Sequence, residues 1–348
     1  MAASLVGLSS LPLAVLLLLT GCGGSAGGGA STSSSAQTTS AAPHSTAVGA
    51  RPSASGPQVL PALVWRRGPD LPVAVSETGV GVVGRDVHVL GGYVGGRAHS
   101  TTHLVLDTTT GTWRTAAALP ERLDHVGVAV VGNRLLLIGG YDASGRPSPR
   151  VYSYDPATDR WSARAPLPLA RAAAAVGVLA GRVHLVGGKG PGGDVAEHDV
   201  YDPATDRWST AAPAPVPRDH AAAAVVGDLL LIAGGRPHNL ARVDAYDPAT
   251  DLWTPRAPLP QGRSALAGAS LDGHLLVLGG EDDTETTVLA TVDALDGATG
   301  RWAALPPVPQ AVQGVQAGVL DGRLYLPGGG PSAGGREQSA HLYLLEPA

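Results

Sequence analysis

Six tryptophans divide most of this chain into segments of nearly equal length. Trp65 is followed by Trp113, Trp161, Trp208, Trp253 and Trp302, at steps of 48, 48, 47, 45 and 49 residues. Gly-Gly pairs repeat with the same steps, at residues 91–92, 139–140, 187–188, 234–235, 279–280 and 328–329. Two markers in register indicate one supersecondary unit copied six times. A period of about 50 residues is typical of toroidal propellers rather than helical solenoids.

Within a unit, short apolar runs alternate with turn residues. In the third unit, an apolar run at 172–179 precedes a turn at 180–182, and a β-branched run at 183–186 ends at the Gly-Gly pair. The alanine-rich first run favours helix by propensity. The equivalent run at 126–131 is rich in Val and Gly, so the repeat favours a strand. Four strands per unit form one blade, and we predict an all-β, six-bladed propeller.

One motif recurs in a fixed order along the chain: Gly-Gly, Tyr-Asp-Pro-x-Thr, Trp and Leu-Pro. The Tyr-Asp-Pro-x-Thr element stands at residues 154–158, 201–205 and 246–250, and the equivalent runs at 106–110 and 295–299 lack the tyrosine. This pattern resembles the kelch repeat over essentially everything after the first 59 residues. The resemblance implies a kelch-type β-propeller at residues 60–348.

The first and last units are incomplete in a complementary way. Trp65 precedes any first, second or third strand, whereas the last unit has its Gly-Gly pair and a strand-like run at 341–345 but no following tryptophan. We therefore predict that the segment around 62–67 supplies the fourth strand of the last blade. Such an N-terminal strand would remove the open edges of the ring.

The N-terminus carries an apolar run at residues 11–19, which is too short for a permanent membrane span and is typical of a secretory signal. It ends in Leu19-Thr20-Gly21-Cys22, which resembles the bacterial lipobox. That resemblance implies a signal peptide at 1–21, lipid attachment at Cys22, and a protein anchored to the membrane in the extracytoplasmic cell envelope. Residues 1–10 contain no Lys or Arg, which indicates either a weak signal or a misplaced start. The alternative to a lipobox is an ordinary signal peptide with an incidental cysteine.

Residues 22–59 are rich in Gly, Ser, Ala and Thr, and we predict a disordered tether there. Cys22 is the only cysteine, so the protein can form no intramolecular disulfide. The net charge is −5 and no basic stripe is present, which argues against a nucleic-acid partner. We expect a monomer.

Register against tryptophan singles out two positions in each unit. Ten residues after each Trp stand Val75, Leu123, Arg171, Arg218, Arg263 and Val312, and Arg122 lies beside the second of these. Twelve residues after each Trp stand Glu77, His125, Ala173, His220, Ala265 and Gly314. One interpretation is an arginine arc at the channel mouth, near Glu77, His125 and His220, that binds an acidic sugar or peptide. In the other, the arginines brace neighbouring loops and the histidines are hydrogen-bonded loop residues.

Metal and cofactor sites are not expected from linear spacing. The histidines lack zinc-like spacing, and Glu281-Asp282-Asp283 lacks the alternating acids of a calcium loop. The kelch resemblance extends to the galactose oxidases, whose copper site requires a cysteine cross-linked to tyrosine. Cys22 lies outside the propeller, so that site is absent. Among kelch propellers, the six-bladed periplasmic sialic acid mutarotases are nearer in compartment and blade count.

The sequence thus predicts a lipid-anchored, extracytoplasmic kelch propeller that binds a protein or a glycan at one mouth, with no catalytic residue assigned. Specificity is expected in the loops after the Gly-Gly pairs, which vary on a rigid scaffold. The alternative is a carbohydrate-active enzyme such as a mutarotase-like epimerase.

Overall fold

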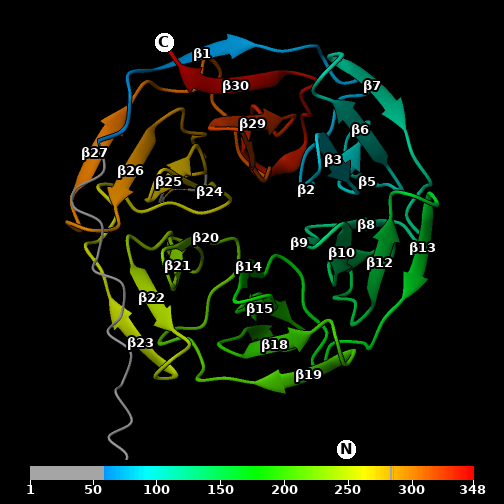
Figure 1. The fold of residues 1–348 in the computed structure, drawn as a ribbon, viewed down its shortest axis with the longest axis horizontal. Coiled ribbons are helices and arrows are strands. Elements are labelled where there is room, and N and C mark those ends of the chain that lie inside the picture. The colour runs from blue at the N-terminus through cyan, green and yellow to red at the C-terminus, as the bar shows by residue number, and fades with distance from the viewer. Residues whose placement is uncertain (1–58, 283, 285) are drawn as a thin grey trace, which may run out of the picture. The chain divides into compact units, whose positions relative to one another are not determined.

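The computed structural model describes residues 59–348 except 283 and 285, and all of them fall in one compact unit. The predicted signal peptide, Cys22 and residues 22–58 of the predicted tether lie outside the described residues. Six four-stranded antiparallel sheets surround a central axis (Figure 1), which confirms the predicted six-bladed all-β propeller. Over the same described residues, no helix is long and apolar enough to cross a bilayer.

Each blade has its first strand at the axis and its fourth at the periphery (Figure 1). Blades 1 to 3 are β2 (Gly79–Val83), β3 (Asp86–Leu90), β6 (His103–Asp107) and β7 (Thr112–Thr115); β9 (Gly127–Val131), β10 (Arg134–Ile138), β12 (Val151–Asp155) and β13 (Arg160–Ala163); and β14 (Ala175–Leu179), β15 (Arg182–Val186), β18 (His198–Asp202) and β19 (Arg207–Thr210). Blades 4 and 5 are β20 (Ala222–Val226), β21 (Leu229–Ala233), β22 (Val243–Asp247) and β23 (Leu252–Pro255); and β24 (Ala267–Leu271), β25 (His274–Leu278), β26 (Val292–Asp296) and β27 (Trp302–Leu305).

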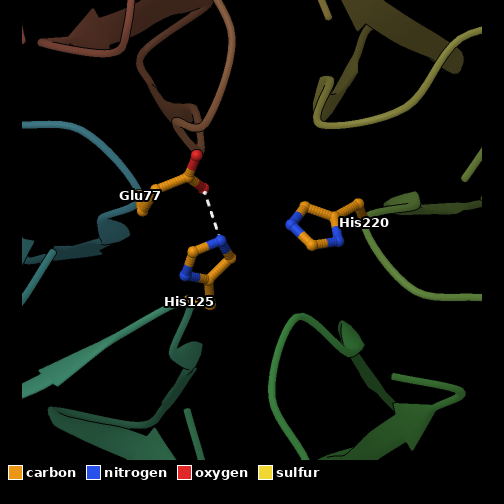
Figure 2. Close-up of side chains that lie close together, drawn as sticks. All are labelled: Glu77, His125 and His220. Atoms are coloured by element: carbon orange, nitrogen blue, oxygen red, sulfur yellow. Dashed lines mark ion pairs between the residues drawn. The ribbon is translucent and has the colours of Figure 1, made fainter. Parts of the chain in front are cut away.

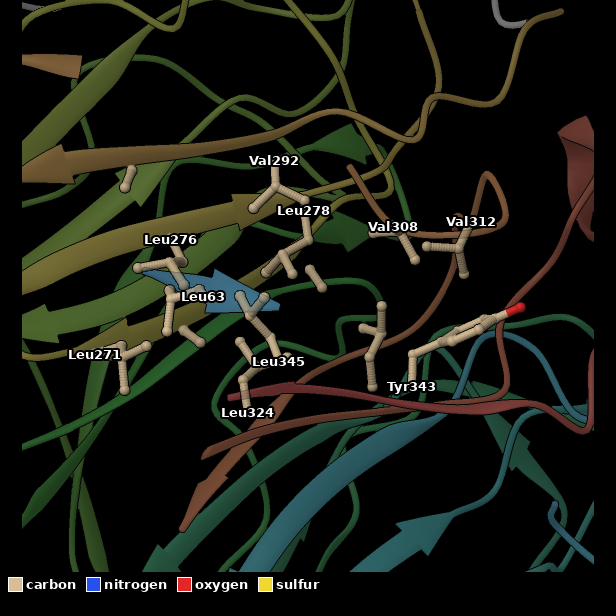
Figure 3. Packing of buried hydrophobic residues seen from close by; sticks show 14 of the residues in the cluster. Leu63, Leu271, Leu276, Leu278, Val292, Val308, Val312, Leu324, Tyr343 and Leu345 are labelled. Carbon is tan, nitrogen blue, oxygen red and sulfur yellow. The ribbon is translucent and has the colours of Figure 1, made fainter. Parts of the chain in front are cut away.

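Blade 6 combines the two ends of the propeller. It contains β28 (Gly318–Leu320), β29 (Arg323–Pro327), β30 (Leu342–Pro347) and, at the periphery, β1 (Leu63–Arg67). Trp65 of β1 lies opposite Leu345 of β30 in the antiparallel ladder. Leu63 packs with Leu324 and Leu345 in the core between blades 5 and 6 (Figure 3). The N-terminal strand is therefore the fourth strand of the last sheet.

Short elements extend the loops that precede the first strands and follow the Gly-Gly pairs. They are β4 (Tyr93–Val94) paired with β5 (Ala98–His99), β8 (Leu123–Asp124) with β11 (Tyr141–Asp142), β16 (Lys189–Gly190) with β17 (Gly193–Asp194), and a 3-10 turn, η1 (Ala333–Gly335).

The Gly-Gly pairs end the second strand of every blade, and all twelve glycines have positive φ. The second glycine of each pair donates its N–H to a carbonyl of the next blade, as Gly140 does to Arg171 O at 2.9 Å. A Cβ at Gly92 would lie 2.3 Å from Ser76 O. Glycine is required here because both the dihedral angle and the close backbone approach exclude a side chain.

The tryptophans link each blade to its neighbour. The indole N–H of each one donates to the backbone carbonyl four residues after the preceding Trp, at 2.8–3.0 Å. The bond from Trp65 to Pro306 O joins β1 to the segment after β27, and so completes the circle. A hydrophobic cluster also fills each of the six interfaces between neighbouring blades.

Candidate functional site

The residues twelve positions after each tryptophan meet at the propeller axis. All six, Glu77, His125, Ala173, His220, Ala265 and Gly314, have φ between 51° and 60°. The N–H of each donates to the carbonyl of its counterpart in the preceding blade at 2.5–3.0 Å, and the bond from Glu77 N to Gly314 O closes the circle. We term these six residues the axial ring. Because its bonds use only backbone atoms, the left-handed conformation belongs to the scaffold, whichever side chain is present.

Three polar side chains of the axial ring converge on one point (Figure 2). Glu77 Oε2 lies 3.2 Å from His125 Nε2. The His125 and His220 rings are 5.0 Å apart between centroids and nearly perpendicular. Gly314 leaves room for the carboxylate, since a Cβ there would lie 2.4 Å from Glu77 Oε1. The register against tryptophan had placed these three residues at one equivalent position, and the structure brings them together.

Buried carboxylates contact the other nitrogen of each imidazole. Asp124 Oδ1 bonds His125 Nδ1, and Asp219 Oδ1 lies 3.0 Å from His220 Nδ1. The two aspartates are 0% and 4% exposed. Burial lowers the pKa of His125, but Glu77 and Asp124 outweigh it, so the pKa is raised above its usual value. Sequence reasoning missed both aspartates, although each directly precedes an axial-ring histidine.

A cavity of about 210 Å³ adjoins the three polar side chains. Its other walls come mainly from loops after the Gly-Gly pairs: Tyr93, Arg97, Tyr141, Arg236, Glu281 and Gly334. Arg236 pairs with Glu281 at 2.5 Å, and Glu281 accepts the N–H of Gly334 at 2.8 Å. Burial and nearby carboxylates raise the pKa of Tyr141 to about 12, so its hydroxyl is neutral. We refer to this cavity as the mouth pocket.

Three residues of the mouth pocket were not named as ligand candidates from the sequence, and Glu281 was considered only as part of an acidic loop, but the repeat contained a signal for all four. Tyr93, Tyr141, Arg236 and Glu281 each directly follow a Gly-Gly pair. In blades 1, 2, 4 and 5 that position faces the pocket, because the turn of the two glycines ends the second strand at this mouth.

The interpretation of the arginine arc as a ligand-binding surface is corrected by the structure. Arg171, Arg218 and Arg263 are at most 1% exposed. Each is ion-paired with an aspartate in the third strand of its own blade: Asp199, Asp244 and Asp293. Each also donates to the carbonyl of the first glycine of its blade's pair, at 3.2–3.4 Å. These guanidinium groups are enclosed and bonded within the protein, so a ligand at the mouth does not reach them.

Arg122 is exposed on the surface, where it donates to His99 O at 3.1 Å. It is not among the residues that line the mouth pocket. Of the candidate binding residues, the structure therefore groups Glu77, His125 and His220, and separates them from the four arginines.

Comparisons with known proteins agree with this architecture. The chain is similar to a solved structure titled "Structure of YjhT", with a TM-score of 0.69 and 19% identity over 79% of this chain and 95% of that one. At this identity the likeness shows the fold alone. The comparison with curated proteins finds no match. A family model described as the KLHDC2/KLHL20/DRC7 Kelch-repeats domain matches residues 78–271. Because this match spans more than half of the chain, the protein belongs to the kelch-repeat family.

Proposed function

We propose that the protein is a lipid-anchored binding module of the bacterial cell envelope whose mouth pocket takes a small carbohydrate. The observation that carries the ligand class is the size of the pocket, about 210 Å³. This volume suits one sugar ring better than a peptide, which would need a longer groove. The membrane anchor rests on the lipobox-like Leu19-Thr20-Gly21-Cys22.

The walls of the mouth pocket supply the groups that a hydroxyl-rich ligand requires. Tyr93 and Tyr141 are half-buried and offer ring surfaces and neutral hydroxyl groups. Arg97 and Arg236 offer donors, and Glu281 offers an acceptor. A few convergent polar groups in a concave site are typical of small-molecule recognition. The guanidinium group of Arg97, which donates to Gly334 O, favours a sugar acid over a neutral sugar.

Calorimetric titration of the full chain with sugar acids and neutral sugars tests this proposal. We expect saturable binding that weakens at least tenfold in Tyr141→Ala. Tyr152→Ala is the matched control, because Tyr152 is another half-buried tyrosine of blade 2, bonded to Glu121 at 3.0 Å and outside the pocket. Binding that Tyr141→Ala leaves unchanged would contradict the site, and a protein partner without any sugar binding would favour the protein-binding alternative.

A second candidate function is a carbohydrate-active enzyme of the mutarotase type. The observation that favours it is the pairing of Glu77 with His125 at 3.2 Å beside the mouth pocket. Opening a cyclic hemiacetal requires a base for the anomeric hydroxyl proton and an acid for the ring oxygen, and a carboxylate with an imidazole can serve as both. Polarimetry of a freshly dissolved single anomer tests it: faster equilibration that Glu77→Gln abolishes supports the enzyme, and an unchanged rate opposes it.

A further inference from the structure

We propose that the axial ring binds a divalent first-row transition metal ion, with Glu77, His125 and His220 as its protein ligands. The carboxylate oxygens and imidazole nitrogens of these residues all lie within 4.8 Å of one another. They come from blades 1, 2 and 4, and Figure 2 shows them facing a common centre. This inference goes beyond sugar binding in the mouth pocket and does not depend on it.

The distances are close to those of a metal site. Bonds of about 2.0–2.2 Å in tetrahedral geometry place neighbouring ligand atoms roughly 3.4 Å apart. Glu77 Oε2 and His125 Nε2, at 3.2 Å, already meet this requirement. The remaining separations, up to 4.8 Å, involve His220. An inward shift of that ring by about 1 Å brings all three atoms within bonding distance of one ion.

The aspartates that precede the histidines give independent support. Metal-bound histidines typically donate their second N–H to a carboxylate, which fixes the ring and its tautomer. Asp124 contacts His125 Nδ1 and Asp219 contacts His220 Nδ1, so the Nε2 atom of each ring is the one left for the centre. His220 Nδ1 and Asp219 Oδ1 are buried without an aligned hydrogen bond. Rotation of the His220 ring on metal binding can satisfy both atoms.

The local charge favours a cation. Glu77, Asp124 and Asp219 place three carboxylates at or beside the centre, with exposures of 9%, 0% and 4%. Of the nearby cationic side chains, Arg236 pairs with Glu281, Lys189 pairs with Asp194, and Arg97 donates to Gly334 O. A bound dication would offset the buried negative charge directly.

The donor set also selects the kind of metal. Two imidazoles and one carboxylate suit Zn²⁺ and its first-row neighbours, whereas Mg²⁺ and Ca²⁺ prefer all-oxygen sites. The other axial-ring residues, Ala173, Ala265 and Gly314, are small. Open coordination positions therefore remain toward the mouth pocket, as in sites that keep a place for water or substrate.

The test is titration of chelator-treated, tag-free full chain with Zn²⁺ alone, followed by calorimetry, with Co²⁺ absorption as a second readout. We expect one ion per chain and visible Co²⁺ bands of a site with nitrogen ligands. His125→Ala, His220→Ala and Glu77→Gln should each weaken binding more than tenfold. The histidine variants should fold, because Ala173 and Ala265 already adopt the same φ of 52° at equivalent positions. Asp219→Asn should weaken binding roughly tenfold through the orientation of His220.

His238→Ala is the matched control, since His238 is an exposed histidine in a loop after a Gly-Gly pair and also has positive φ. Its Zn²⁺ affinity should equal that of the unmodified chain. The proposal is overturned if the three-residue variant Glu77→Gln/His125→Ala/His220→Ala binds as much Zn²⁺ as the unmodified chain, or if the single variants bind with unchanged affinity. Sugar titration of the metal-free protein is a separate measurement, so failure of either proposal leaves the other testable.

Discussion

The buried arginines are matched by a second residue that changes with them from blade to blade. Blades 3, 4 and 5 pair an arginine before the first strand with an aspartate in the third strand. In the other blades both positions are apolar or aromatic: Val75 with Leu104, Leu123 with Tyr152, and Val312 with Tyr343. The charge is present only where its partner is present, as expected for a buried pair within the scaffold.

Arg171→Met should lower the free energy of unfolding by about 3–5 kcal/mol, because Asp199 would be left buried without its cation. Arg171→Met/Asp199→Leu should recover a large part of that loss, since it resembles the apolar pairs of the other blades. Denaturant unfolding of the two variants measures both effects. A single variant that kept full stability but lost a ligand would instead restore the ligand-binding interpretation of the arc.

Two buried histidine pairs make the stability depend on pH. His88 bonds His103 and His184 bonds His198, each at 2.9 Å. Burial lowers the pKa of His88 to about 3 and the pKa values of His103, His184 and His198 to about 4. The unfolded chain takes up protons near pH 6.5 while the folded chain does not. The free energy of unfolding should therefore be constant above pH 6.5 and fall between pH 6.5 and 4. Each histidine contributes at most about 1.4 kcal/mol per pH unit to this fall.

Replacing one pair tests this dependence within the same fold. His184→Leu/His198→Val copies Leu136 and Val151, which occupy the equivalent positions of blade 2. The unfolding midpoint of this variant should decline less between pH 7 and pH 5 than that of the unmodified chain. Equal declines in the two proteins would show that other groups cause the acid sensitivity.

The five-residue strand β1 stabilises the propeller in three ways. It completes the ladder of β30, buries Leu63 and carries the indole that bonds Pro306. Without β1, the long edge of β30 would be unpaired, which is a site for association between chains.

Deleting residues 59–68 should lower the unfolding midpoint by at least about 5 °C. Loss of the Leu63 burial alone costs about 1.5–3 kcal/mol, and each kcal/mol shifts the midpoint of a domain of this size by roughly 2–4 °C. Calorimetric melting measures the change. Deletion of residues 49–58, within the predicted tether, is the control and should leave the midpoint unchanged. Equal midpoints for the two deletions would contradict the closing role of β1.

Across the whole molecule, the sequence repeat predicts the backbone scaffold, but it does not predict which way a side chain points. The tryptophan register gave six blades and placed Glu77, His125 and His220 at one position, which the structure confirms as neighbours. The same register could not show that Arg171 turns inward to Asp199, because that depends on a partner from another strand. The proposed metal site could not be predicted from linear spacing. Its three ligands come from three blades, and they lie close together only in the closed ring.

The proposed lipid attachment at Cys22 determines whether the whole chain is bound to the membrane. Cys22→Ser should move the protein from the detergent phase to the aqueous phase on detergent partitioning, because the only site for lipid attachment would be lost. The unfolding midpoint of the propeller should not change. Retention of the variant in the detergent phase would contradict lipid attachment at Cys22.

The backbone hydrogen bonds of the axial ring have a consequence for how new activities can arise on this fold. Alanine, glycine, histidine and glutamate all occupy its six positions with nearly the same φ. Substitution can therefore exchange the chemistry at the axis one residue at a time while the fold is kept, except at Gly314, where a Cβ would lie 2.4 Å from Glu77 Oε1. Ala173→His or Ala265→His would place a further imidazole at the same centre. A single substitution can therefore change the reactivity of the site while the protein stays folded.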